Sequence, residues 1–458
     1  MFQGLSPAYW LTLHGLICAL AVLTYVIASH LMHQRRHPTA AIAWVLFILL
    51  MPYVALPAFL LFGSRKRARN RAWPFPSVSR ASAGASWPVQ TIVALGQPEP
   101  APYCDFALHG DGKQALAALW DVLDGAQHSI DLCTFILGRD DIGEAVIDKL
   151  CAKAKSGVKV RLLLDGLGSL MAGRPRMRAL TDCGGEFLLF VPPLHSPLKG
   201  RTNLRDHRKM LVVDAAYDNR RLWCGGRNLA SEYFEGNADK AVWHDLSFDL
   251  RGPLVLQAHA LFEHDWAFAR GRRHQALPSP ATWLPAVDLA PPPAAQLIAS
   301  GPDQVDDTIY SLLVTAAYRA QSAIALVTPY FVPDSALLTA LCLAARRGVM
   351  VDLLVPANSN HRMSDVARNR ALRTLADAGA HIWLAPQMVH AKLAVIDDVL
   401  ALAGSANLDS RSLFLNYELM FAFHSAPDIA RFRDWFDAER STAAAYVADR
   451  RGFLRDVA

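Results

Sequence analysis

The chain lacks the cysteine spacing that a zinc site or a disulfide framework needs. Its 458 residues include seven cysteines, which are scattered and form no C-x-x-C pair. Several of them lie in apolar runs, where a free thiol behaves as a small hydrophobic side chain. The pattern predicts a reducing compartment and excludes a small domain held together by disulfides.

Charged residues are absent from two stretches near the N-terminus, Tyr9–Leu31 and Pro38–Gly63. Each is long enough to cross a hydrocarbon core of about 30 Å as a helix. The first has no preceding basic residues, and its apolar run is too long for a cleaved signal peptide. We therefore predict a two-helix membrane hairpin over residues 1–64, with a signal anchor followed by a re-entrant segment as the alternative. Pro52 and Pro57 favour a kink in the second helix.

Basic residues are unevenly distributed around these stretches. Five follow the second stretch within Ser64–Arg71, whereas the turn between the stretches holds Arg35 and Arg36. The positive-inside bias then places the rest of the chain in the cytoplasm, and the same cluster would attract anionic lipid head groups. Residues 65–102 are predicted to be a basic flank and linker, because Trp73 begins a region rich in Pro, Ser and Ala.

The rest of the chain repeats itself in order. Gly157-Val158-x-Val160-x-Leu162-Leu163 in the first half returns as Gly348-Val349-x-Val351-x-Leu353-Leu354 in the second. Both halves alternate strand and helix patterns, which is typical of the α/β class. We predict a tandem duplication. Its domains would span residues 103–277 and 297–458, joined by a Pro-rich linker over residues 278–296.

The motif H-x-K-x4-D occurs once in each half. Its copies are His207, Lys209 and Asp214, then His390, Lys392 and Asp397. Each copy is followed by a turn of small residues with an asparagine, namely Gly225, Gly226 and Asn228, then Gly404, Ser405 and Asn407. In a strand, residues two apart point to the same side, so each copy directs an imidazole and an ammonium into one space.

These side chains suit the chemistry of a phosphoryl group. The lysines would neutralise its oxygens, and donors such as Asn228, Ser405 and Asn407 would bind the charge that grows in the transition state. One histidine can attack phosphorus while the other gives a proton to the leaving alcohol.

Carboxylates recur at matching positions after the two motifs. Asp245 and Glu418 fall on equivalent strands, where each could fix the tautomer and orientation of a histidine. The histidines have no carboxylate or cysteine partners at metal-ligand spacing. We therefore expect no metal and no other cofactor, with metal-assisted hydrolysis as the weaker alternative.

The doubled motif resembles that of the phospholipase D superfamily, and the wider pattern is similar to bacterial cardiolipin synthases. The likeness includes Glu232-Tyr233, Pro329-Tyr330-Phe331-x-Pro333-Asp334 and Asn416-x-Glu418. It implies two α/β lobes related by pseudo-twofold symmetry, with one site at their interface. It also implies that a phosphatidyl group passes between two phosphatidylglycerol molecules through a phosphohistidine, with release of glycerol.

The same resemblance implies roles for individual residues. His207 would be the nucleophile and His390 the general acid and base, although the duplication leaves the order open. Lys209, Lys392, Asn228, Ser405 and Asn407 would hold the phosphate. Asp214 and Asp397 belong to the catalytic motif but are expected to brace the fold. One departure is Asp206, which stands where the family usually has asparagine.

The expected partners are anionic phospholipids, above all phosphatidylglycerol, and the bilayer. The implied location is the bacterial cytoplasmic (inner) membrane, as a multi-pass protein with cytoplasmic catalytic domains. The sequence leaves the oligomeric state open. A membrane-tethered phosphodiesterase, either a phospholipid hydrolase or a nuclease, is the alternative function, and a non-catalytic scaffold is a third. No nucleic acid partner is expected, because the lobes lack dense interleaving of basic and aromatic residues.

Overall fold

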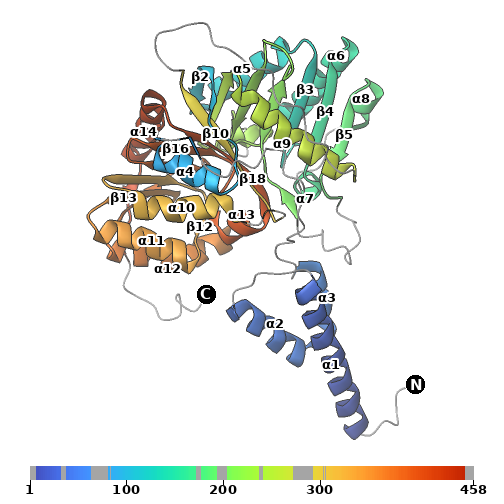
Figure 1. Cartoon of the computed structure of the whole chain (residues 1–458). Coiled ribbons are helices and arrows are strands. Elements are labelled where there is room, and N and C mark those ends of the chain that lie inside the picture. The colour runs from blue at the N-terminus through green and yellow to red at the C-terminus, as the bar shows by residue number, and fades with distance from the viewer. Residues whose placement is uncertain are drawn as a thin grey trace.

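The computed structural model describes residues 7–31, 38–62, 81–82, 84–171, 177–192, 204–236, 241–271, 292–302, 304 and 306–448. The basic run Ser64–Arg71 and the prolines from Pro278 to Pro291 lie outside these residues. Within them, the chain forms an N-terminal helical part and a larger body of two lobes (Figure 1).

The N-terminal part contains three helices: α1 (Pro7–Leu31), α2 (Pro38–Leu50) and α3 (Pro52–Phe62). Tyr25 of α1 packs against Phe59 of α3, with ring centroids 4.8 Å apart. The second apolar stretch is therefore not one helix but two, broken before Pro52, which agrees with the expected kink. No helix in the described part of the chain is long and apolar enough to span a bilayer, so the predicted hairpin is not confirmed.

The predicted linker over residues 65–102 is partly wrong. Its end forms helix α4 (Trp87–Ala94) and strand β1 (Ala101–Pro102). Ile92 of α4 is fully buried in the core of the second lobe, and α4 lies against α10 (Figure 1). The spacing of Val89, Ile92 and Val93 gives one apolar helix face, which the richness in Pro, Ser and Ala obscured.

The first lobe is built on a seven-stranded sheet in the order β2-β9-β8-β7-β3-β4-β5. Its strands are β2 (Cys104–His109), β3 (Ser129–Thr134), β4 (Lys159–Leu164), β5 (Glu186–Leu189), β7 (Met210–Val213), β8 (Arg221–Gly225) and β9 (Ser247–Arg251). Strands β3, β4 and β5 are parallel, and the others join antiparallel. The helices are α5 (Gly112–Gly125), α6 (Asp141–Lys155), α7 (Gly166–Met171), α8 (Met177–Asp182) and α9 (Leu254–Ala269).

The second lobe repeats this order in a ten-stranded sheet. Its matching path runs β10-β18-β16-β15-β11-β13-β14. These strands are β10 (Ala294–Ser300), β11 (Ala323–Val327), β13 (Met350–Pro356), β14 (His381–Ala385), β15 (Leu393–Ile396), β16 (Leu400–Gly404) and β18 (Asn416–Phe423). Strands β1, β6 (Arg205–Asp206) and β19 (Ala444–Ala445) add to the sheet, and β12 (Phe331–Val332) pairs separately with β17 (Leu408–Asp409). The helices are α10 (Thr308–Arg319), α11 (Ser335–Arg346), α12 (Arg362–Asp377), α13 (Ser410–Phe414) and α14 (Ala426–Ser441).

The prediction of two repeated α/β lobes is confirmed. Gly157 and Gly348, which mark the sequence repeat, both follow a helix with φ near +90°, a conformation that suits glycine. The linker expected over residues 278–296 extends too far, since β10 already begins at Ala294. Ala295 is buried in the sheet and Ala294 partly buried, although both directly follow a run of prolines.

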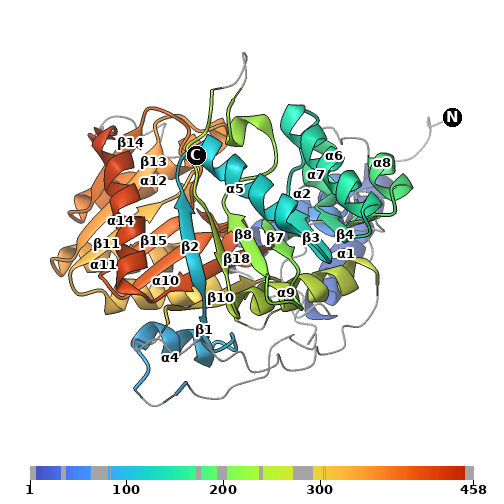
Figure 2. The same ribbon diagram turned by 90° about the horizontal axis from the view of Figure 1, so that it is seen from above.

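The two sheets meet through a shared apolar core. In Figure 2 the lobes lie side by side, with β8, β10 and β18 near the middle. Phe248 of β9 packs on Phe421 of β18 at 5.4 Å, and Phe106 of β2 on Phe423 at 5.1 Å. Burial of these aromatic side chains between the sheets holds the lobes together as one body. Residues at the lobe interface therefore have fixed positions.

Candidate active site

Short backbone pairings across the lobe interface bring the two motifs together. Strand β6 pairs in parallel with the start of β18, and the amide of His207 donates to the carbonyl of Tyr417 at 2.9 Å. The reverse contact uses the other motif: the amide of His390 donates to the carbonyl of His244 at 2.6 Å. Each histidine is thus tied to the residue that precedes a carboxylate of the opposite lobe.

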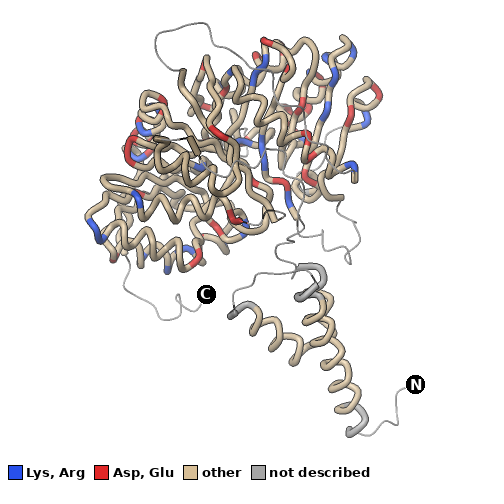
Figure 3. Tube along the Cα trace, viewed as in Figure 1, with Lys and Arg blue, Asp and Glu red and all other residues tan. Residues whose placement is uncertain are grey.

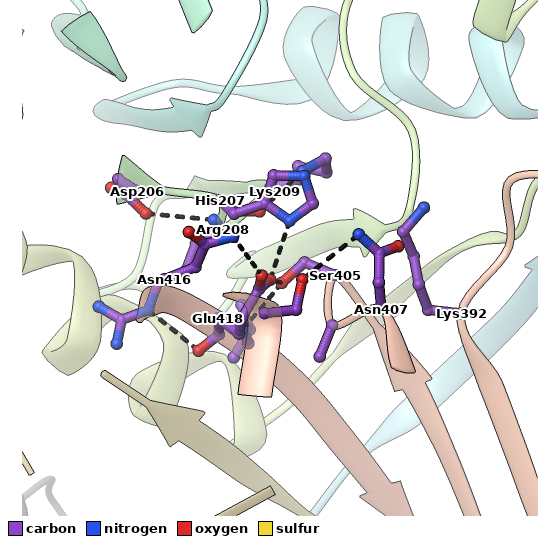
Figure 4. Close-up of polar contacts among 12 residues, drawn as sticks. Asp206, His207, Arg208, Lys209, Lys392, Ser405, Asn407, Asn416 and Glu418 are labelled. Atoms are coloured by element: carbon purple, nitrogen blue, oxygen red, sulfur yellow. Dashed lines mark hydrogen bonds and ion pairs between the residues drawn. The ribbon is translucent and has the colours of Figure 1, made fainter. Parts of the chain in front are cut away.

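The carboxylates are exchanged between the lobes. Nδ1 of His207 lies 2.9 Å from Oε2 of Glu418, and Nδ1 of His390 lies 2.7 Å from Oδ2 of Asp245. Both carboxylates are fully buried, and Figure 4 shows Glu418 between His207 and Ser405. A carboxylate that accepts the Nδ1 proton leaves the lone pair on Nε2, the atom available to attack or to take a proton.

The spacing of the motif had suggested that its histidines and lysines lie within strands. In the structure they lie just before the strands. Strand β7 begins at Met210 and β15 at Leu393, so both H-x-K runs precede the strands. The side chains still converge. Nζ of Lys209 donates to the carbonyl of His207 at 2.7 Å, and Nζ of Lys392 lies 3.0 Å from Nε2 of His390.

Burial lowers the basicity of the whole cluster. It lowers the pKa of Lys209 to about 8 and that of Lys392 to about 7, against the opposing effect of the carboxylates. Burial, followed by the charge of Lys392, lowers the pKa of His390 to about 3. Burial also lowers the pKa of His207, with Glu418 opposing it.

The carboxylates remain ionised in this site. Burial alone would raise the pKa of Asp245, but His390 and Lys392 lower it to about 2. Burial likewise opposes a lowered pKa at Glu418, which His207 and Lys209 produce. Two carboxylates therefore balance two ammonium groups, and an added phosphodiester anion would be balanced when one imidazole takes a proton.

The candidate phosphate donors are already engaged in other contacts. Asn228 accepts from the amide of Ile136 at 3.3 Å and donates to the hydroxyl of Tyr233 at 2.8 Å. Ser405 donates to Glu418 at 2.6 Å, which places its hydroxyl on the carboxylate rather than free for phosphate. Asn407 donates to Ser412 only at 3.3 Å, and no described residue donates to its Oδ1.

The motif aspartates lie away from the histidines, at the far ends of β7 and β15. Asp214 accepts from the amides of Gln127, His128 and Ser129 at 2.7–2.8 Å, and it has a φ of 49°. Asp397 has a φ of 46° and accepts from the amides of Gln321, Ser322 and Ala323 at 2.8–2.9 Å. Both carboxylates hold the backbone where a central strand of their lobe begins. Although they belong to the motif, they do not lie among the residues that would react with the substrate.

One cluster in the described part of the chain has donor atoms suited to a metal. Asp131, His259 and Glu263 have ligand atoms within 4.8 Å of one another. The guanidinium of Arg161 lies 2.6 Å from both Asp131 and Glu263, so a cation already neutralises these carboxylates. The cluster lies on β3 and α9 and includes neither His207 nor His390. It does not change the expected chemistry of the site.

Family comparison agrees with this geometry. A model of the family "Cardiolipin synthase, PLD-like domain" matches residues 119–266 and 313–440, and one of "Phospholipase_D-nuclease N-terminal" matches residues 19–64. The chain belongs to the cardiolipin synthase family of phospholipase D-like proteins.

Curated relatives cover most of the chain. It is 30% identical to the cardiolipin synthase of Geobacillus thermodenitrificans over 423 residues, 88% of this chain and 82% of the relative. It is 28% identical to cardiolipin synthase 1 of Bacillus cereus, over 94% of this chain and 89% of the relative. It is also 28% identical to cardiolipin synthase A of Pseudomonas putida, over 90% and 88%.

Solved structures share the fold. The phosphatidylserine synthase of Haemophilus influenzae superposes with a TM-score of 0.56 at 14% identity, covering 76% of this chain and 89% of that one. The polyphosphate kinase of Porphyromonas gingivalis superposes with a TM-score of 0.51 at 13% identity, covering 75% and 48%. These likenesses support the two-lobed architecture.

Sequence reasoning missed three contributors to this family site. Arg208 is buried, and its Nε donates to the carbonyl of Glu418 at 3.2 Å (Figure 4). Tyr233 and Trp243 wall His390, with ring centroids 5.1 and 5.4 Å away. The motif itself marks the position of Arg208, which lies between His207 and Lys209.

Proposed function

We propose that the protein is a cardiolipin synthase that transfers a phosphatidyl group from one phosphatidylglycerol to a hydroxyl of a second, releasing glycerol. The observation that carries this is the exchange of carboxylates: one buried site holds two histidines, each oriented by the opposite lobe. In this proposal the first domain (103–277) supplies His207 and Asp245. The second, beginning with β10 at Ala294 rather than at 297, supplies His390 and Glu418.

In the first step, Nε2 of His207 attacks phosphorus and the bond from phosphorus to the glycerol oxygen breaks. His207 takes this role because its side chain is 11% exposed, against 5% for His390, which packs against both Tyr233 and Trp243. Lys209 and Lys392 neutralise the nonbridging oxygens as charge shifts onto them. Glu418 stabilises the positive charge that His207 gains.

His390 supplies the proton for the departing glycerol. Its low pKa in the free protein results from burial and the nearby Lys392. A phosphodiester anion between the lysines opposes that effect, so substrate binding favours the imidazolium form. In the second step the now neutral His390 takes a proton from the hydroxyl of the second phosphatidylglycerol, whose oxygen attacks phosphorus and releases His207.

The proposal includes attachment to the bacterial cytoplasmic membrane through α1–α3, as a multi-pass protein with the catalytic body on the cytoplasmic side. These helices contain no Asp, Glu, Lys or Arg (Figure 3). Side chains such as Leu11, Leu16 and Leu50 are 58–75% exposed, which suits a lipid environment.

Product analysis tests the reaction. Purified full-length protein in mixed micelles with labelled phosphatidylglycerol is expected to yield cardiolipin and glycerol in equal amounts, measured by mass spectrometry. Phosphatidic acid as the main product would replace the transferase by a hydrolase. Adding phosphatidylethanolamine as a second lipid tests the donor choice in the same experiment.

Covalent trapping tests the assignment of the histidines. His207→Ala and His390→Ala should each abolish turnover, but only His390→Ala should accumulate a phosphatidyl group on the remaining histidine. A lipid adduct on both variants, or on neither, would overturn the assignment. EDTA is expected to leave turnover unchanged, because Lys209 and Lys392 supply the positive charge.

A further inference from the structure

The first turns of α12 expose apolar side chains beside basic ones. Met363 is 88% exposed and Val366 47%. Arg362 and Arg370 are exposed on the same helix, and Arg362, Val366 and Arg370 are spaced four apart, which places them on one face. Asp365 faces inward, where it accepts from the amide of Ser359 at 2.9 Å. This face is therefore both apolar and basic.

The first lobe exposes an apolar side chain at the matching place. Leu170 of α7 is 56% exposed, and α7 follows β4 as α12 follows β13, the equivalent parallel strand. Two residues earlier, Gly168 lies so close to Phe135 that an added Cβ would come within 3.0 Å of its ring. Phe135 in turn packs edge-on against His207 at 5.0 Å.

The start of α12 lies beside Tyr330, whose charge state affects a neighbour of the other histidine. The hydroxyl of Tyr330 donates to Oδ1 of Asn360 at 2.6 Å, and its ring lies 5.2 Å from His361, the residue before α12. Burial raises the pKa of Tyr233, and nearby Tyr330 adds to the rise. Tyr233 contacts His390 at 5.1 Å. Leu170 thus lies on the helix that approaches Phe135, the neighbour of His207, and α12 begins beside Tyr330.

The same side of the catalytic body faces the N-terminal helices. Figure 1 shows α7 and α12 on the side toward α1–α3. Those helices contain no charged residues, whereas basic and acidic residues both lie along the lower edge of the second lobe (Figure 3). An anionic surface at the level of α1–α3 would therefore lie on the side of the second lobe that carries α12.

We propose that Leu170, Arg362, Met363, Val366 and Arg370 form a rim surface that inserts into the head-group region of an anionic bilayer. This inference rests on the proposed function, in that the substrate is a membrane lipid. The arginines bind lipid phosphates and the apolar side chains enter between the head groups, as in interfacial helices. Contact there brings the phosphodiester of a bilayer lipid to the entrance of a site whose histidines are almost fully buried.

Photo-crosslinking tests the contact independently of turnover. The full-length protein, reconstituted in phosphatidylglycerol vesicles, would carry p-benzoylphenylalanine in place of Met363, of Val366 or of Met350. Met350 is the matched control because it is 45% exposed but lies at the opposite end of β13. Lipid adducts at 363 and 366 but not at 350 are expected, with lower yields in phosphatidylcholine vesicles. Equal yields at all three positions, none at 363, or no dependence on lipid charge would overturn the proposal.

Kinetics on two forms of the substrate provide the second test. The double variant Met363→Ser and Val366→Ser should raise KM for phosphatidylglycerol in vesicles by about tenfold, the ratio expected from losing roughly one buried apolar side chain. Its activity on short-chain phosphatidylglycerol dissolved as monomers should match wild type, as should Met350→Ser on both substrates. An equal loss on both substrates would overturn the rim surface. If wild type makes no cardiolipin, the proposed function fails, yet crosslinking still decides the rim.

Discussion

Glu418 Oε2 lies 2.9 Å from Nδ1 of His207, although the two residues belong to different lobes. Asp245 makes the reverse contact to His390 at 2.7 Å. A lobe by itself would hold a histidine without its carboxylate and a carboxylate without its histidine. The duplicated halves are consequently not two half-strength sites. They are one site that exists only when both lobes are docked.

The exchange predicts a strong effect of Glu418→Gln. The amide cannot stabilise the imidazolium of His207, so kcat should fall on the order of 10²- to 10⁴-fold, as when an orienting aspartate is amidated in a serine protease. Phosphohistidine formation should slow in parallel. Asp428→Asn is the matched control, because Asp428 is also a buried carboxylate but accepts from Tyr103 at 2.6 Å, away from the site. Wild-type kcat in Glu418→Gln would contradict the orienting role.

The buried lysines predict opposite trends of activity and stability with pH. With a pKa of about 7, Lys392 loses its charge as pH rises through neutrality, and Lys209 follows at about 8. The value of kcat/KM should therefore decline between about pH 7 and pH 9, since fewer molecules can bind the phosphate.

Stability should change in the other direction. A lysine whose pKa is lowered by folding binds its proton more weakly in the native state, so its contribution to the free energy of unfolding rises from about pH 7 toward its unfolded pKa near 10.4. Lys392→Met should abolish turnover, raise the melting temperature at pH 6 and flatten this rise. Thermal unfolding across the pH range measures it. A lower melting temperature for the variant at pH 6 would show that the buried charge does not destabilise the fold.

Asp214→Asn should lower stability and leave the chemistry intact. Asparagine tolerates the positive φ at this position but accepts more weakly from the three amides that Asp214 holds. We expect a loss of roughly 1–3 kcal/mol in the free energy of unfolding, with kcat per folded molecule within about twofold of wild type. Asp397→Asn should behave alike. A large fall in kcat with an unchanged free energy of unfolding would show that these residues take part in the reaction.

The repeat explains why the lobes could be predicted and their contacts could not. Gly157-Val158 and Gly348-Val349 mark equivalent turns, so the strand order of one lobe follows from the other. Periodicity acts within a few residues, whereas the contact of His207 with Glu418 joins residues 211 positions apart. Aligning the two halves of the chain matches Asp245 to Glu418, but it does not show which histidine each carboxylate contacts.

The prediction of a linker from composition failed at short elements that are stable only through contacts with the second lobe. Strand β1 has only two residues and exists because it adds to the edge of β10. Helix α4 has eight residues and is held by burial of Ile92 against the second lobe. Isolated helices of this length are unstable in water, so no local signal would be strong. Their burial in the second lobe is a tertiary effect.

Asp206 predicts a pH-dependent gain in stability from Asp206→Asn. Burial, then the charge of Asp265, raises its pKa to about 8, so the carboxyl is mostly protonated at neutral pH. Asparagine can accept from the amide of Arg208, as Oδ1 of Asp206 does at 3.1 Å, and its NH2 group can donate to the sulfur of Cys133, which lies 3.3 Å from Oδ2. Activity at pH 7 should therefore remain close to wild type.

The effect on stability follows from the raised pKa. Between its unfolded pKa near 3.9 and about 8, the native carboxyl keeps a proton that the unfolded chain has lost, so the free energy of unfolding falls as pH rises through this range. The asparagine variant has no carboxyl to titrate at this position, so it does not lose stability in this way. The stability advantage of Asp206→Asn should therefore be near zero at pH 4, grow to about pH 8 and then level off. Denaturant unfolding of wild type and variant at several pH values measures the difference. A constant difference would mean that Asp206 is ionised throughout, and the raised pKa would be wrong.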